Sequence, residues 1–414
     1  MITNREYLKR LISLQKLISD NDLDCFIVSS QENIYYLTGA TYKPLERPFF
    51  IIVRPSEEPI FLVPKLEEQH MMKAAIGKTI SYWEFPAPEG LNWYDKLAEI
   101  IRNCKKIGIE PSLPVQHKNI LLKNSFLKDI RMTSMPLVEK LRIIKSPPEI
   151  EMIKIASNYA VKGMKLIFDN AYFGASVLEM FSLSKDLQIE VIKKGNFTPL
   201  DTEFLTACWP APFSALPHGI PKISDKLKDG PIVGMSFHRI NGYAAECERT
   251  FFLKDPTNEE KEFFEIMITA REKALSEIRA DVYATNIDNI VSDYLKDMGM
   301  KKYLLHRTGH GIGLGNHEAP WIAEGSSDIL KENMVISIEP GIYIPEIGGF
   351  RHSDTVLVKK NGYEILTNFP TDLKSMIITK KRLLKKVKGK MVQKVLNLHK
   401  YEKTTVDNNL DTNI

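Results

Sequence analysis

The sequence predicts an α+β protein with two domains, and three observations support this. The chain has 414 residues, more than a single hydrophobic core usually serves. Short β-rich runs alternate with helical or polar stretches over residues 1–135, which indicates an α/β domain with a mixed sheet. Beyond residue 148, helix-rich and strand-rich stretches appear twice, which suggests a pseudo-duplicated α+β domain.

The boundary between the two domains is expected near residue 145. Ser146 stands before Pro147, Pro148 and Glu149, an order typical of a helix start, where serine caps the helix and proline fits the first turn. The chain therefore divides into an N-terminal domain (1–145), a second domain (146–378) and a basic C-terminal tail (379–414).

The second domain is expected to alternate helices with strands. Its expected helices are residues 148–170, 177–194, 257–278 and 284–299. Its expected strands are residues 231–238 and 242–253, followed by a strand-rich half over 304–367.

Composition excludes several classes of protein. Hydrophobic residues make up 43% and charged residues 26%, as in soluble globular proteins, and no apolar run is long enough to span a bilayer. The four cysteines form no CxxC pair, which argues against a structural zinc site and a disulfide framework. We therefore expect a protein of the reducing cytoplasm.

Positive charge is concentrated in the tail. Residues 379–414 hold 10 Lys/Arg and 3 Asp/Glu, a surplus of +7, so a net charge of +4 leaves −3 for the rest of the chain. The tail has apolar residues at helical spacing between its lysines, which suits either an anionic partner or a solvated helix. The stretch KKRLLKKVKGKMVQKVLNLHK within the tail lacks the aromatic residues that single-strand binders stack on bases, so a nucleic acid is not an expected partner.

Chemically active residues gather in three blocks, and two shorter motifs accompany them. The blocks are GYAAECERTFFL (242–253), HRTGHGIGLGNHEAP (306–320) and SIEPGIYIPEIGGFRHSDTVLV (337–358), and the motifs are NIYYLTG (33–39) and PHG (217–219). In this order and spacing they resemble the creatinase, aminopeptidase P and prolidase family over residues 7–378. The resemblance implies a creatinase-like N-terminal α/β domain, a pseudo-duplicated pita-bread catalytic domain and a hydrolase acting on C–N bonds.

The metal-dependent members of this family are similar in five ligands: two aspartates, one histidine and two glutamates that hold two metal ions. The positions that match them here are Ser236, Glu246, His310, Glu339 and Ser353. Adjacent divalent cations require carboxylates to offset their repulsion, and a neutral serine cannot do so. The metal site thus resembles a degenerate one, although Glu246, His310 and Glu339 could still hold one divalent metal such as Mn or Zn.

Creatinase, the metal-independent member, is similar to this chain in the triplet Glu248, Arg249 and Thr250. The resemblance implies that Glu248 and Glu339 hold a cationic group of the substrate and that His218 transfers a proton. We therefore expect no cofactor and a small carboxylate-bearing amidino, ammonium or peptide-like substrate. The expected catalytic residues are His218, Glu248, Glu339 and His310.

Four further residues are expected to bind the substrate: Arg47, His317, Arg351 and Glu246. Arg47 resembles a creatinase arginine that reaches across a dimer interface to the substrate carboxylate, which implies a homodimer. A planar guanidinium suits this role because it pairs with a carboxylate through two hydrogen bonds.

Two other functions stay open. One is a mononuclear Xaa-Pro metallopeptidase that uses Glu246, His310 and Glu339, against which Ser236 and Ser353 count. The other is a catalytically silent pita-bread module that binds peptides or proteins, against which the retained histidines and glutamates count.

Overall fold

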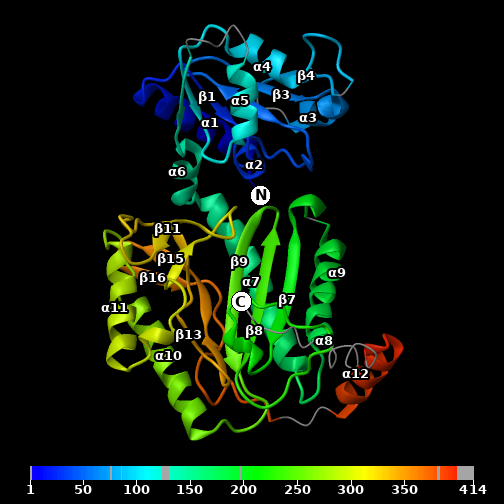
Figure 1. Ribbon diagram of the computed structural model, residues 1–414, viewed down its shortest axis with the longest axis vertical. Coiled ribbons are helices and arrows are strands. Elements are labelled where there is room, and N and C mark those ends of the chain that lie inside the picture. Colours follow the sequence, from blue (N-terminus) through cyan, green and yellow to red (C-terminus); the bar gives the residue numbers. More distant parts are fainter. Residues whose placement is uncertain are drawn as a thin grey trace, which may run out of the picture. The chain divides into compact units, whose positions relative to one another are not determined.

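The computed structural model describes residues 2–74, 77–84, 86–123, 130–195, 197–379 and 383–398. The chain forms two compact units, Met1–Ile144 and Lys145–Ile414 (Figure 1). The functional division into segments 1–145, 146–378 and 379–414 stays a prediction, because compactness alone does not assign a role to each segment.

The first unit is an α/β domain with a mixed sheet. Its six strands lie in the order β4-β3-β2-β1-β5-β6. β1 (Cys25–Val28) pairs antiparallel with β2 (Phe50–Val53) and parallel with β5 (Lys106–Ile109). The other strands are β3 (Ile60–Pro64), β4 (Lys78–Tyr82) and β6 (Arg131–Ser134). The helices are α1 (Asn4–Asp20), α2 (Gln31–Thr38), α3 (Glu68–Ala74), α4 (Trp93–Ile101), α5 (Val115–Leu122) and α6 (Leu137–Ile143).

The second unit is built on one long sheet with two similar halves. The strand order is β11-β10-β12-β15-β9-β8-β7, with β16 beside β15 and a separate β13-β14 ribbon. These strands are β7 (Glu203–Trp209), β8 (Ile232–Ile240), β9 (Tyr243–Phe251), β10 (Gly309–Gly311), β11 (Glu318–Ile322), β12 (Val335–Ile338), β13 (Gly341–Ile344), β14 (Gly348–Arg351), β15 (Ser353–Lys359) and β16 (Gly362–Ile365).

Each half of this sheet has its own helices (Figure 1). α7 (Pro147–Asn170) packs on β8 and β9, while α8 (Val177–Ser182) and α9 (Ser184–Lys194) contact β7. α10 (Asn258–Ser276) and α11 (Ala284–Asp297) pack on each other and on the other half. The last helix of the described residues is α12 (Leu383–Val395). This repeated arrangement confirms the predicted pseudo-duplicated α+β unit.

The start of α7 agrees with its sequence, whereas the next expected helix is broken. The Ser146 N–H donates to the Glu149 carboxylate at 2.9 Å, which satisfies a free amide at the helix end. The single helix expected over 177–194 is divided at Leu183. The hydroxyls of Ser182 and Ser184 donate to backbone carbonyls nearby, and such bonds compete with the regular helix ladder.

No helix in the described part of the chain combines the length and the apolar character of a membrane span.

Candidate active site

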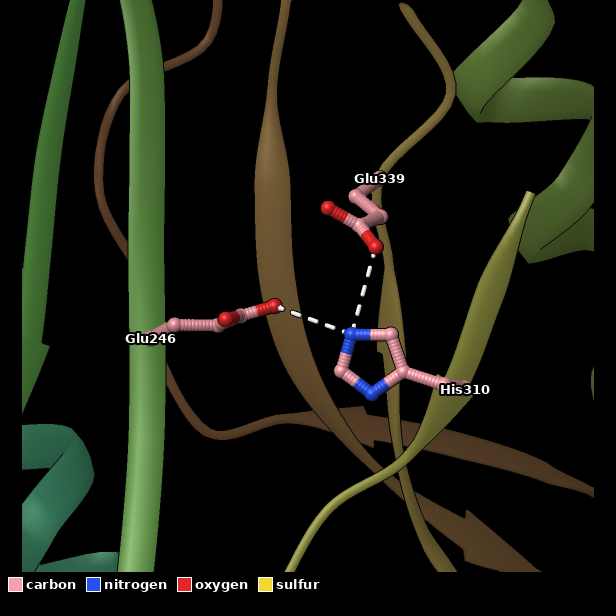
Figure 2. A group of neighbouring side chains, drawn as sticks. All are labelled: Glu246, His310 and Glu339. Atoms are coloured by element: carbon pink, nitrogen blue, oxygen red, sulfur yellow. Dashed lines mark ion pairs between the residues drawn. The ribbon is translucent and has the colours of Figure 1, made fainter. Parts of the chain in front are cut away.

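Three side chains from one sheet meet in the second unit: Glu246 of β9, His310 of β10 and Glu339, which directly follows β12 (Figure 2). His310 Nε2 lies 3.2 Å from Glu339 Oε1 and 3.7 Å from Glu246 Oε1. One potential ligand atom from each residue lies within 4.8 Å of the others. The structure therefore brings together the three residues that the sequence analysis gives as a possible site for one divalent metal.

The orientation of the His310 ring is fixed by the backbone. Its Nδ1 lies 2.9 Å from the carbonyl of Gly311, so Nδ1 carries the hydrogen that it donates. The other nitrogen, Nε2, then faces the two carboxylates. It is buried and makes no hydrogen bond of good geometry among the described residues.

The charges of the cluster are strongly coupled. Burial raises the pKa of Glu246, and the negative charge of Glu339 raises it further. Burial also raises the pKa of Glu339, but the close approach and positive charge of His310 outweigh it and lower the pKa of this carboxyl below its usual range. Burial opposes protonation of His310, whereas the two carboxylates raise its pKa above the ordinary value. A proton on His310 thus balances the carboxylates, a role that a bound cation would also fill.

Two serine hydroxyls hold the carboxylate of Glu246 from one side. Ser353 Oγ donates to Glu246 Oε1 at 3.0 Å, and Ser337 Oγ donates to the same oxygen. Ser337 lies on β12 opposite His310, so it faces the same side of the sheet. Ser337 is a site residue that the sequence analysis missed. Its register beside the histidine of the GHG motif emerges only when β10 and β12 pair.

Met235, and not Ser236, shares a face of the sheet with this cluster. β8 pairs with β9 so that Met235 lies opposite Glu248 and Ser236 opposite Cys247, and paired residues point to the same side. The Ser236 hydroxyl instead lies 2.9 Å from Nε2 of His238, on the side covered by α7. The structure therefore contradicts the prediction that Ser236 takes the place of the first aspartate.

A local signal in the sequence could have placed Met235 correctly. Asn241 and Gly242 form the two-residue turn between β8 and β9, with φ of 47° and 84°. An Asn-Gly pair is the preferred sequence for such a hairpin turn. Counting outward from this turn pairs Met235 with Glu248.

Glu248 is held in a buried network rather than presented to a ligand. Arg351 Nη2 donates to Glu248 Oε1 at 2.8 Å, and Arg351 Nη1 donates to the hydroxyl of Tyr343 at 3.0 Å. The Tyr343 hydroxyl in turn lies 2.7 Å from Nε2 of His306. Because Arg351 neutralises the carboxylate of Glu248, a clamp of Glu248 and Glu339 around a cationic substrate loses one of its two free charges.

The ring of His317 packs against the ring of His310. The rings of His310 and His317 lie 3.9 Å apart at their centroids, and His317 is exposed on its outer side. Burial and the adjacent charge of His310 lower the pKa of His317 to about 4. The Nη2 of Arg307 lies 3.3 Å from Nδ1 of His317, which accepts this hydrogen bond and leaves Nε2 as a donor. His317 is therefore neutral near pH 7.

Two residues expected at the site lie elsewhere or at its margin. Arg47 belongs to the first unit, where its Nε donates to Glu84 at 2.6 Å. His218 is exposed on the connection between β7 and β8, and its charge acts on both His306 and His317. Roles for Arg47 and His218 in substrate binding or catalysis stay predictions.

Comparison with known proteins identifies the family. Residues 151–360 match the sequence profile of metallopeptidase family M24, and residues 10–144 match the profile of the creatinase/prolidase N-terminal domain. The chain belongs to metallopeptidase family M24. The resemblance to the creatinase and prolidase family is thereby confirmed.

M24 relatives match over nearly their whole length. The Xaa-Pro dipeptidase of Pyrococcus furiosus is 30% identical over 367 residues, 88% of this chain and 99% of the relative. The structure of the prolidase from Pyrococcus horikoshii is similar with a TM-score of 0.74 and 28% identity, over 88% of this chain and 99% of the other. An Xaa-Pro dipeptidase structure from Bacillus anthracis also has a TM-score of 0.74, with 25% identity over 89% and 99% of the two chains.

Membership of M24 confirms one prediction and overturns another. The prediction of a hydrolase acting on C–N bonds is confirmed. The prediction that it needs no cofactor is wrong, because the family is one of metallopeptidases and the structure contains a Glu/His/Glu cluster. The metal-independent, creatinase-like reaction is accordingly not supported, and the metallopeptidase alternative fits better.

The M24 site of this chain fits one divalent cation. The free Nε2 of His310 and the oxygens of Glu246 and Glu339 form a set of three N/O ligands, which suffices for a catalytic cation with an open position. A second cation would need further carboxylates, but Met235 and Ser353 beside the cluster are neutral.

Proposed function

We propose that this M24 protein hydrolyses the peptide bond before proline in short peptides, using one divalent cation held by Glu246, His310 and Glu339. The observation that carries the proposal is the convergence of these three side chains, with Nε2 of His310 turned toward both carboxylates. The Xaa-Pro dipeptidases among the relatives support the choice of substrate. Mn²⁺ or Zn²⁺ suits a site with one imidazole and two carboxylates.

The cation would supply Lewis-acid polarisation of the scissile carbonyl. The chain's own residues position the ligands. The Gly311 carbonyl fixes the tautomer of His310, while Ser337 and Ser353 hold Glu246 toward the cluster. Groups that orient metal ligands in this way commonly affect affinity and activity ten- to a hundred-fold.

His317 and His218 would bind the substrate and transfer a proton to it. Neutral His317 offers an Nε2–H donor beside the cluster, suited to a substrate carbonyl oxygen. His218 lies on an exposed connection close enough to interact electrostatically with His317, which suits protonation of the leaving nitrogen. The homodimer, the contribution of Arg47 from a partner subunit and the cytoplasmic location remain part of this proposal.

A panel of small substrates tests the proposed reaction. We expect turnover of Ala-Pro, far slower turnover of Ala-Ala, and none of creatine. Chelation should remove the activity, and added Mn²⁺ should restore it. Turnover of creatine, or cleavage of Ala-Pro that persists after the metal is stripped, would contradict the proposal.

A further inference from the structure

The C-terminal helix α12 lies beyond the part of the chain that the M24 family description matches, which ends at residue 360. The Pyrococcus furiosus relative aligns with 88% of this chain, although 99% of the relative is covered. This chain therefore carries residues without a counterpart in that relative. None of the catalytic geometry described above uses α12.

α12 lies beside α8 in the second unit (Figure 1), and one of its faces contacts α7 and α8. Lys385 Nζ donates to the backbone carbonyl of Asp169 at 2.6 Å, and Gln393 Nε2 donates to Glu179 at 2.7 Å. Between these two contacts, Gly389 approaches Tyr172 so closely that a Cβ atom at this position would clash with the tyrosine hydroxyl. The helix therefore has a defined orientation.

The opposite face of α12 is an exposed apolar stripe. Its members follow one another at spacings of three, four and four residues, which places them on one side of a helix. They are Leu384, Val387, Met391 and Val395, with exposed fractions of 85%, 45%, 63% and 77%. Soluble proteins rarely leave such a continuous stripe in contact with water alone.

A row of lysines borders this apolar stripe. Lys386, Lys390 and Lys394 are spaced four residues apart, and all three are exposed. Residues 383–398 contain five lysines and no acidic residue. An apolar stripe beside a cationic row is typical of helices that lie in the plane of a membrane surface, with the lysines directed to anionic headgroups.

We propose that α12 binds an anionic phospholipid surface through its apolar stripe and its lysine row. The stripe would enter the region between headgroups and acyl chains while the lysines contact lipid phosphate and carboxylate groups. A nucleic acid would satisfy the lysines but would leave the apolar stripe in water. The orientation set by Lys385, Gly389 and Gln393 presents this face without any rearrangement of α12.

Co-sedimentation of the full-length chain with lipid vesicles tests the proposal. We expect binding to phosphatidylcholine vesicles that contain phosphatidylserine, little binding to phosphatidylcholine alone, and weaker binding at high salt. The triple variant Leu384→Ser, Met391→Ser and Val395→Ser should bind at least about ten-fold more weakly, because it loses most of the inserted apolar surface. Leu66→Ser, a change at a 70% exposed leucine of the first unit, should leave vesicle binding unchanged.

A second variant separates the contribution of charge from that of insertion. Lys386→Gln, Lys390→Gln and Lys394→Gln together should reduce both the affinity and its dependence on salt. All variants should retain peptidase activity and helical content, since these side chains lie outside the active site. Absence of binding to the phosphatidylserine vesicles, unchanged binding by the stripe variant, or stronger binding to double-stranded DNA than to vesicles would overturn the proposal.

Discussion

Replacement of His310 by alanine is expected to lower kcat/KM for Ala-Pro by at least about 10³-fold, since Lewis-acid stabilisation is worth several kcal/mol. His310 supplies the only imidazole of the Glu246, His310 and Glu339 cluster, in a unit described over residues 145–195, 197–379 and 383–398. Its loss should also release the divalent cation. Steady-state kinetics together with elemental analysis of the same preparation measure both effects.

Two matched changes control for this result. His70→Ala removes an exposed imidazole from the first unit and should leave kcat/KM close to that of the unaltered protein. Ser236→Ala removes the hydroxyl that faces α7 rather than the cluster, so activity should again persist. If His310→Ala retained activity, or if Ser236→Ala lost it while still folded, the assignment of the metal ligands would be wrong.

Replacement of Arg351 by methionine is expected to lower the free energy of unfolding by about 3–5 kcal/mol, the typical cost of leaving one member of a buried ion pair alone. Arg351 is 6% exposed and Glu248 is 3% exposed, so water cannot compensate the carboxylate that remains. The change also removes the hydrogen bond to Tyr343. Denaturant unfolding of the two proteins measures the difference.

The double change of Arg351→Met with Glu248→Met distinguishes a structural pair from a substrate clamp. Removal of both charges should recover much of the lost stability, because no unpaired carboxylate is then buried. Without this recovery, Glu248 would not be the residue that Arg351 neutralises. A Glu248→Gln variant with an unchanged free energy of unfolding would likewise exclude the structural role, because that role requires the charge that pairs with Arg351.

The fold could be predicted because it depends largely on local patterns. The alternation of β-rich and helical segments predicts the mixed sheet of the first unit, and the Ser146 to Glu149 segment predicts the start of α7. The positions of His310 and Glu339 follow from the resemblance of the GHG and EPGIY motifs to the family's active-site blocks.

What could not be predicted depends on register and on long-range pairing. A shift of one residue along β8 moves each side chain to the other face of the sheet. The sequence prediction therefore places Ser236 where the structure has Met235. The pairing of Glu248 with Arg351 joins residues 103 positions apart, and it decided whether Glu248 was free to hold a substrate. Ser337 of β12 likewise becomes a partner of Glu246 of β9 only when both strands pair with β15.

The number of divalent cations bound per chain tests the central claim most directly. Protein stripped of metal and titrated with Mn²⁺ should bind one ion per chain, and turnover of Ala-Pro should rise in parallel and reach its limit at one equivalent. This result follows from a site with three ligands beside the neutral side chains of Met235 and Ser353. Binding of two ions per chain, or full turnover without any ion, would contradict it.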